Sequence, residues 1–125
     1  MWYRYSMVKR VSLVAVFDGD KVLLGKKPSG FWLPGGHANE NESSLDAGIR
    51  EIKEETGLDI KDLVLFHSKI SDDKITDFYV CKNFSGKAEA NDDLQEVHWF
   101  DISELPVMRL DGNDLVLKAY KEICL

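Results

Sequence analysis

Three glutamates in the segment REIKEETG, residues 50–57, have the spacing for shared chemistry. Glu51, Glu54 and Glu55 are three and four residues apart, which makes them neighbours on a helix. Each like-charged pair costs roughly 0.2–0.5 kcal/mol in an isolated helix. A divalent cation would turn this repulsion into attraction, because hard cations bind carboxylate oxygens. The alternative interpretation is a solvated acidic face that binds nothing.

The flanking residues predict the helix that must hold these glutamates. Ser43 followed by Asp46 resembles a capping box, and Gly57 is a natural helix end. An apolar stripe recurs at i, i+4 and i+7, formed by Leu45, Ile49 and Ile52. At about 100° per residue, the glutamates fall on a separate arc. They are therefore expected to face an open surface, with no carboxylate directed at the core.

Strand-like runs surround this helix. Residues 10–17 and 21–26 flank an Asp-Gly-Asp turn and predict a hairpin. The Pro- and Gly-rich stretch that follows predicts a loop with one short extended piece at residues 31–33. Three more strands, a helical turn and a closing helix are expected at residues 63–70, 75–84, 96–100, 101–105 and 113–123. This order predicts one domain over residues 1–125, of the α/β class (α+β type), with a mixed sheet covered by helices.

Composition excludes several classes of protein. A net charge of −6 and the lack of a basic stripe argue against stable nucleic-acid binding. No apolar run reaches membrane-spanning length, so no membrane association is expected. Cys81 and Cys124 lie in apolar segments without metal spacing and are expected to be reduced thiols, which suits a cytoplasmic protein. The first nine residues are expected to be an added edge strand, a partner surface or a flexible extension.

Extended backwards, the acidic segment reads GHANENESSLDAGIREIKEETGL, residues 36–58. The order is a glycine, five residues, a glutamate, seven residues, then Arg-Glu-aliphatic-x-Glu-Glu-x-Gly-aliphatic. This pattern resembles the Nudix box, and its defining positions are filled by Gly36, Glu42, Arg50, Glu51, Ile52, Glu54, Glu55, Gly57 and Leu58. VLLGKKPSGFWLPGG before the box and EVHWFDISELP after it also resemble Nudix segments. The chain is therefore identified as a member of the Nudix hydrolase superfamily, similar to MutT-like enzymes.

The resemblance implies an α/β/α sandwich and hydrolysis of a nucleoside diphosphate linked to another group, by metal-activated water. It implies Mg²⁺ as cofactor, with Mn²⁺ as a substitute, held by the Gly36 carbonyl, Glu51, Glu54 and Glu55. Arg50 would orient the glutamates, and it can also pair with Asp46 or Glu54 as an ordinary helix salt bridge. Glu42 would support the loop.

Further residues outside the box glutamates carry expectations. Glu96 is expected to be an additional metal ligand or general base, or else a solvent-facing carboxylate on its strand. Lys26 would contact phosphates, while Gly35 and His37 would lie at the substrate. The alternative interpretations are that Lys26 is simply exposed to solvent and that His37 is a loop residue without a functional role. Asp92 and Asp93, in the loop before Glu96, are weaker candidates, and His67 and His98 are expected on strand surfaces.

The substrate is predicted by elimination. ADP-ribose hydrolases carry a proline about sixteen residues beyond the box, near Lys74 here, and none is present. What remains is a MutT-like nucleoside triphosphate pyrophosphohydrolase that releases a nucleoside monophosphate and pyrophosphate, as a monomer or homodimer. ADP-ribose, a nucleotide sugar, a dinucleoside polyphosphate or an RNA 5′ end could replace the triphosphate as substrate. The sequence is also compatible with a non-catalytic nucleotide sensor or a plain Mg²⁺- or Ca²⁺-binding protein.

Overall fold

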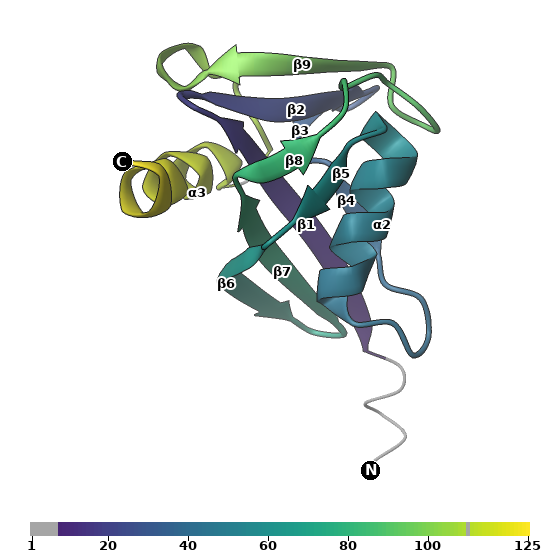
Figure 1. The fold of residues 1–125 in the computed structure, drawn as a ribbon. Coiled ribbons are helices and arrows are strands. Elements are labelled where there is room, and N and C mark those ends of the chain that lie inside the picture. The colour runs from purple at the N-terminus through teal and green to yellow at the C-terminus, as the bar shows by residue number, and fades with distance from the viewer. Residues whose placement is uncertain (1–7, 110) are drawn as a thin grey trace.

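The computed structural model describes residues 8–109 and 111–125 (Figure 1). Up to the first helix, the elements are β1 (Lys9–Asp18), β2 (Lys21–Lys27), β3 (Gly30–Trp32), β4 (Gly35–His37) and α2 (Ser44–Thr56). They continue with β5 (Asp59–Lys61), β6 (Val64–Ser71), β7 (Lys74–Cys81), β8 (Asn83–Ser85) and β9 (Glu96–Asp101). The last are a 3₁₀ turn, η1 (Ile102–Glu104), then α3 (Gly112–Ala119) and a π-helical turn, η2 (Tyr120–Cys124). Most of residues 1–9, expected as an extension, lies outside the described residues.

Within the described ranges, the main sheet contains seven strands and is mixed. Its central order is β3-β2-β1-β7-β6, with β4 paired to β1 and β9 paired to β2. β1 and β7 run parallel, whereas the other pairs of this sheet are antiparallel. β1 begins beside β4 and ends beside β2, so it is shared by two parts of the sheet. The expected mixed sheet is confirmed.

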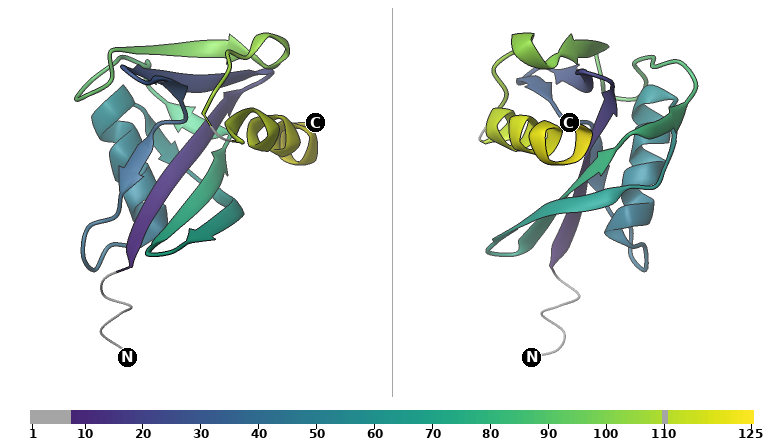
Figure 2. Two further views of the ribbon diagram at one scale, coloured as in Figure 1. Left: turned by 180° about the vertical axis from the view of Figure 1, so that it is seen from behind. Right: turned by 60° about the vertical axis from the view of Figure 1, so that its left-hand side comes forward.

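The two helices lie on opposite faces of the sheet (Figure 2). Side chains of β1 alternate between these faces, as the period of a strand requires. Leu13, Phe17 and their neighbours pack in one cluster with Val116 of α3, while Val14 and Ile52 belong to a second cluster on the α2 side. The arrangement is the expected α/β/α sandwich.

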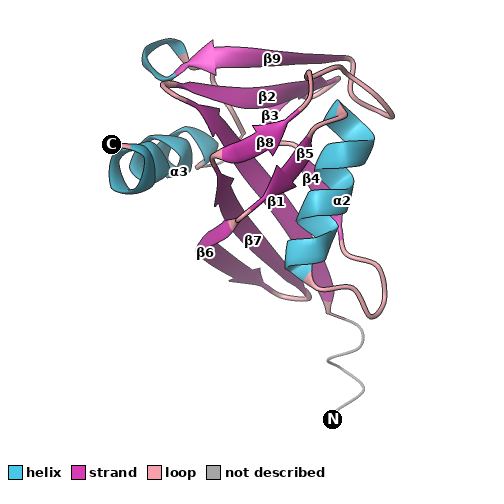
Figure 3. Ribbon diagram, viewed as in Figure 1, coloured by secondary structure: helices cyan, strands magenta, loops and turns pink. Residues whose placement is uncertain are grey.

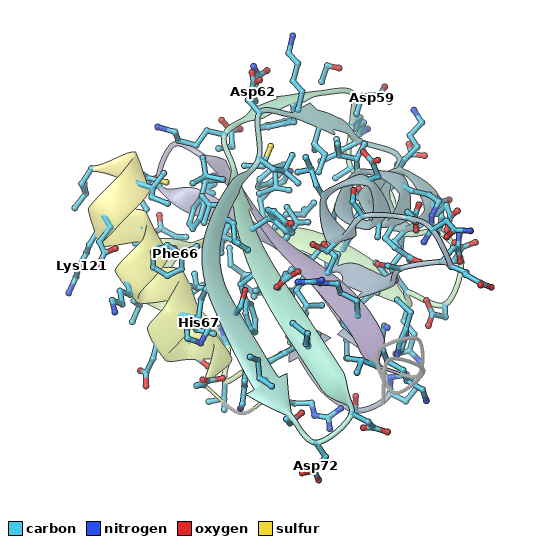
Figure 4. The ribbon with its side chains drawn as sticks, turned by 90° about the horizontal axis from the view of Figure 1, so that it is seen from below. Asp59, Asp62, Phe66, His67, Asp72 and Lys121 are labelled. Atoms are coloured by element: carbon cyan, nitrogen blue, oxygen red, sulfur yellow. The ribbon has the colours of Figure 1, made fainter. Side chains whose placement is uncertain are left out.

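The edge strand β6 meets α3 on the same face as that first cluster. Figure 4 shows Phe66 and His67 of β6 lying beside α3. Phe66 packs against the cluster and His67 is exposed, as expected for a strand-surface histidine. Among the described residues, no helix is long and apolar enough to span a membrane.

Two expected boundaries are wrong, and β5 is an additional strand. The Gly-rich stretch expected as a loop contains β4, because Gly35 and Gly36 form a short ladder with Leu13 and Ser12. The strand expected over residues 75–84 ends at Cys81, and β8 then pairs with β5 in a separate two-stranded sheet (Figure 3). β5 itself is too short, at three residues, to give an apolar period.

The caps of α2 are those predicted. The Ser43 hydroxyl accepts a hydrogen bond from the Asp46 amide at 3.1 Å, and Gly57 closes the helix with a φ of 79°. A positive φ at this position favours glycine. The start and end of the glutamate-bearing helix are therefore fixed by local sequence.

The predicted orientation of α2 is only partly correct. Ile52 is fully buried, but Leu45 is 40% exposed. Small residues, Ala47 and Gly48, face the sheet instead, and a Cβ at Gly48 would lie 2.7 Å from the Ser12 hydroxyl. This close approach fixes the rotation of α2 about its own axis, so that one of the three glutamates is buried.

Candidate active site

Glu55 is the buried member of the glutamate cluster, with 3% of its surface exposed. Its Oε1 accepts a hydrogen bond from the Gly35 amide at 2.8 Å, which ties the last turn of α2 to β4. Burial raises the pKa of this carboxyl to about 7, and the Gly35 bond and the charge of Lys27 oppose that effect. The expectation that all three glutamates face an open surface is therefore wrong for Glu55.

Glu51 lies against Gly36, the residue of β4 that follows Gly35. A Cβ on Gly36 would come within 2.7 Å of the Glu51 carboxyl carbon, so the strand passes this side chain with no space for a larger residue. Glu51 is partly exposed and Glu54 is exposed. Thus Glu51 and Glu55 meet consecutive glycines of β4, and Glu54 lies at the outer edge.

Arg50 connects the cluster to the loop before the helix. Its Nε and Nη2 donate to the two oxygens of Glu42, both at 2.9 Å, and Nη2 also donates to the His37 carbonyl at 3.0 Å. Its Nη1 donates to Glu51 at 2.9 Å and to Glu54 at 3.1 and 3.2 Å. The expected pairing with Glu54 is present. Among the described residues, Glu42 and Glu51, not Asp46, are its other acidic partners.

These bonds set the charges of the network. The hydrogen bonds from Arg50, assisted by the Asn39 amide, lower the pKa of Glu42 to about 2. The same contacts, led by Glu42, raise the pKa of Arg50 further above its ordinary value. Arg50 is thus a permanent cation placed between carboxylates, and its expected orienting role stays a prediction.

Lys26 and Glu96 face each other across the β2–β9 pair. Their charged groups are 3.5 Å apart, and Glu96 also shares a 2.8 Å hydrogen bond with His98. Lys26 lies 5.7 Å from the ring centre of Phe31. The bond with His98 and the charge of Lys26 lower the pKa of Glu96. Lys26 and Glu96, both predicted as site residues, therefore form an ion pair with each other.

The sequence offers Lys26 and Lys27 as adjacent candidates and favours Lys26, but Lys27 is the one whose charge acts on Glu55. Lys27 pairs with Asp93 at 3.5 Å, and the charges of both residues act on the buried carboxyl of Glu55. Asp93 belongs to the segment 89–95, which is fixed by main-chain bonds from Glu89, Asn91 and Gln95 to the carbonyls of Thr56, Glu55 and Lys26. The signal in the sequence was the Lys26-Lys27 pair itself, because adjacent residues of a strand point to opposite faces.

The loop residues behave differently from one another. Gly35 is buried and acts through its amide, whereas the His37 side chain is exposed and only its carbonyl contacts Arg50. The side chain of His37 lines a broad hollow with Lys9, Arg10 and the loop 38–42. Gly35 therefore acts on the glutamates, while the substrate contacts predicted for both residues stay predictions.

The donor set fits a hard divalent cation. Among the described residues, no three Asp, Glu, His or Cys side chains form a ready metal cage. However, the carboxylates of Glu51 and Glu54 already share one cationic group, Nη1 of Arg50. Carboxylate oxygens are the ligands that Mg²⁺ prefers. A bound ion would have to take over oxygens that Arg50 contacts here.

A stability measurement without metal tests the burial of Glu55. Because its folded pKa is raised, the folded protein binds the extra proton, and stability falls as the pH rises from about 4.5 through 7. Glu55→Gln removes this penalty, so at pH 8 in EDTA it should stabilise the protein by about 2 kcal/mol, or roughly 5–10 °C in Tm. At pH 5 the gain should largely disappear. Equal gains at both values would contradict the buried, proton-binding carboxyl.

The comparisons with known proteins agree with this geometry. The family model described as NUDIX domain matches residues 7–121. An ADP-ribose pyrophosphatase of Methanocaldococcus jannaschii is 32% identical, over 94% of this chain and 76% of that protein. A Streptococcus suis ADP-ribose pyrophosphatase has a similar structure, with a TM-score of 0.72, 26% identity, and 92% and 93% of the two chains covered.

A structure of a MutT NUDIX hydrolase from Burkholderia pseudomallei is also similar in fold. Its TM-score is 0.76 at 23% identity, with 88% of this chain and 95% of that chain covered. The box residues thus lie on a fold shared with solved Nudix proteins. The family match covers nearly the whole chain. The chain therefore belongs to the NUDIX family and is a Nudix hydrolase.

Proposed function

We propose that this Nudix hydrolase cleaves nucleoside triphosphates in a metal-dependent reaction, releasing a nucleoside monophosphate and pyrophosphate. The observation that carries the proposal is the placement of Glu51 and Glu55 against consecutive glycines of β4, with two lysines at the nearby end of β2. Carboxylates for a cation and cations for phosphates are thereby brought to one region. A triphosphate needs both kinds of group.

The proposed cofactor is Mg²⁺, with Mn²⁺ as a substitute. It would be held by Glu51, Glu54, Glu55 and the Gly36 carbonyl, and when bound it supplies an activated water and neutralises phosphate charge. Arg50 holds Glu51 and Glu54 in place from the loop side. In this account the chain itself contributes the orientation of the carboxylates.

Glu96 fits a supporting role better than that of a general base. Its contacts with His98 and Lys26 lower its pKa, and a lowered pKa weakens a proton acceptor at neutral pH. It instead fixes the position of the Lys26 ammonium group. We therefore assign Glu96 to holding the phosphate-binding lysine.

ADP-ribose is the second candidate substrate. A relative with 32% identity is named an ADP-ribose pyrophosphatase, and so is a structurally similar protein. ADP-ribose contains the same diphosphate, so the carboxylates and lysines would act on it in the same way. The two candidates differ only in what is attached beyond the diphosphate.

A substrate panel with product identification tests the function. Nucleoside triphosphates, ADP-ribose, a nucleotide sugar and a dinucleoside polyphosphate are each incubated with the protein in Mg²⁺, then in Mn²⁺. The expected result is a nucleoside monophosphate and pyrophosphate from a triphosphate. AMP and ribose 5-phosphate as the main products would favour ADP-ribose. No hydrolysis of any compound would refute the proposal.

The two lysines are expected to differ in effect. Lys27→Ala removes the cation that acts on Glu55 and frees Asp93, so both kcat and KM should worsen, by roughly tenfold or more in kcat/KM. Lys26→Ala should mainly raise KM, since Lys26 is paired to the exposed Glu96. Lys21→Ala, at the far end of β2, is the matched control. Unchanged kinetics in both variants would remove the lysines from the site.

A further inference from the structure

Strand β6 leaves one long edge of the main sheet open. It is the last strand in the order β3-β2-β1-β7-β6, and among the described residues it pairs only with β7. Its eight residues, Val64–Ser71, are exposed apart from Phe66, which is partly buried. The N–H and C=O groups that point away from β7 therefore have no strand to bond within the described part of the chain. Such an edge is a ready template for pairing with another strand.

The usual protections of a strand edge are weak in β6. Short length, charged side chains and proline are common ones. β3 and β4 are only three residues long, and β9 carries Glu96, His98 and Asp101. β6 has eight residues, no proline and a single side chain of fixed charge, Lys69. Of the edges that the structure describes, β6 is therefore the best suited to pairing.

Large apolar side chains are exposed along this edge. Leu65 is 53% exposed and Ile70 is 78% exposed. Leu65 lies opposite Tyr79 and Ile70 lies opposite Ile75, so both point to the α2 side of the sheet. They share a face although five residues separate them, because the irregularity at Phe66 inserts one extra residue.

We propose that β6 pairs with β6 of a second copy of this chain, antiparallel and about a two-fold axis at Ser68. An axis perpendicular to the sheet keeps the α2 sides of both copies on one face. With Phe66 outside the ladder, Ile70 of each copy then lies opposite Leu65 of the other, on that face. By symmetry this contact forms twice, and each time two exposed apolar side chains cover each other.

The order of residues around the axis favours a second copy over an unrelated strand. Ser68 is small and uncharged, so it can lie opposite itself. A register centred at Lys69 would place two lysines directly opposite each other, which is destabilising. A register centred at His67 would place Ile70 beyond the start of β6 in the second copy. The strand is thus complementary to itself about one point.

The two ends of β6 differ in charge in a way that suits antiparallel pairing. Figure 4 shows Asp62 and Asp72 at opposite ends of the strand. Pairing brings the Asp72 end of one copy to the end of the other that follows Lys61. There Asp62 accepts a hydrogen bond from Asn83 at 2.9 Å, so Lys61 is the group that faces Asp72. Complementary charges of this kind help to fix the register of an interface.

The size of the contact sets the strength that we expect. At about 3.3 Å per residue the edge is about 26 Å long and one strand wide. Stable interfaces bury about 1,200–2,000 Å², so a contact this narrow should give a reversible dimer whose population rises with concentration. The active-site glutamates pack against β4, which is separated from β6 by β1 and β7. Pairing therefore leaves the candidate active site open and does not depend on the proposed function.

Sedimentation equilibrium of the full chain, from micromolar to near-millimolar concentration, tests the pairing. The wild-type protein should pass from monomer to dimer over this range. Ile70→Lys places a charge against Leu65 of the second copy twice in each dimer, so it should raise the dissociation constant roughly tenfold or more. Val107→Lys is the matched control, because Val107 is an exposed apolar residue of a loop. It should leave the dissociation constant unchanged.

Cysteine cross-linking tests the register. Ser68→Cys should form a disulfide between two copies on oxidation, since directly opposite Cβ atoms are about 4.5–5.5 Å apart. Ser71→Cys is the control on the same strand, because three residues from the axis it would lie about 20 Å from its copy. It should not cross-link. The wild-type protein under the same oxidant accounts for any reaction of the partly exposed Cys124.

A wild-type protein that is monomeric at every concentration would overturn the inference, and so would a dimer that Ile70→Lys leaves intact. Cross-linking through Ser71→Cys instead of Ser68→Cys would overturn it as well, since the self-complementarity would be lost. Should Ser68→Cys not fold, because Ser68 donates to Asp77 at 2.7 Å, the dissociation constants decide alone. Hydrolysis by Ile70→Lys should equal that of the wild type, so the pairing and the proposed function fail separately.

Discussion

Glu55→Gln is expected to lower kcat for the best substrate by roughly 10³-fold in Mg²⁺, with the fold retained. Glutamine can still accept the hydrogen bond from the Gly35 amide, so the helix end stays tied to β4. It cannot supply a negative oxygen for a divalent ion. A loss of this size corresponds to about 4 kcal/mol of transition-state stabilisation, within what metal assistance provides.

Steady-state kinetics and calorimetric titration with Mg²⁺ check this prediction together. The matched control is Glu89→Gln, an exposed glutamate whose amide, not its side chain, bonds to the end of α2. Glu89→Gln should leave kcat unchanged. Near-wild-type turnover by Glu55→Gln would show that its carboxylate is not needed as a ligand. Unaltered metal uptake with lost turnover would assign Glu55 to proton transfer instead.

Arg50→Gln is expected to lower both stability and activity. The guanidinium group is shared by Glu42, Glu51 and Glu54, and its removal leaves three acidic groups without their common cation. Because hydrogen bonds to charged groups are each worth about 1.5–3 kcal/mol and this site is partly solvated, we expect a net loss of about 2 kcal/mol. Activity should fall as well, since the glutamates lose their orientation.

The pH dependence gives this prediction its sharper test. The pKa of Glu42 is lowered to about 2 in the folded protein, so its contribution to stability is present above about 4.5 and is lost as the pH falls toward 2. Thermal unfolding in EDTA should show the full difference between wild type and Arg50→Gln at pH 7, and a smaller one below pH 4. Arg50→Lys restores the charge but not the forked geometry and should recover only part of the loss. A difference independent of pH would contradict the Glu42–Arg50 pairing as its source.

The sequence predicted what depends on local order along the chain. The caps at Ser43 and Gly57 and the hairpin between β1 and β2 follow from residue types at fixed offsets, and all are present. The spacing of the glutamates also placed all three on α2. Such features need no knowledge of what packs against them.

Features that depend on packing could not be predicted in the same way. A helical projection places Glu55 on an arc but does not say which arc meets the sheet, and here the close contact of Gly48 with Ser12 decides it. Gly35 and Gly36 resemble a loop in sequence, yet a Cβ at Gly35 would lie 2.0 Å from the Ser12 carbonyl oxygen. Glycine is therefore required by the neighbouring strand.

The choice between two adjacent lysines shows the same limit. The two-residue period of a strand predicts that Lys26 and Lys27 point to opposite faces. Only the pairing of β2 with β9 shows that Lys26 lies opposite Glu96. The charge near Glu55 then belongs to Lys27. Sequence spacing identified the right place on the strand, and the structure adds Lys27 to Lys26 there.

The segment 89–95 is attached to α2 and β2 by main-chain hydrogen bonds from Glu89, Asn91 and Gln95, and by the Asp93–Lys27 ion pair. Most side chains along it are consequently free to change without detaching the segment, apart from Leu94, which is buried against Gly25. Mutational libraries confined to positions 89–93 should therefore yield many folded variants with altered charge beside Glu55. This stretch is the natural starting point for redirecting the enzyme toward new phosphate compounds.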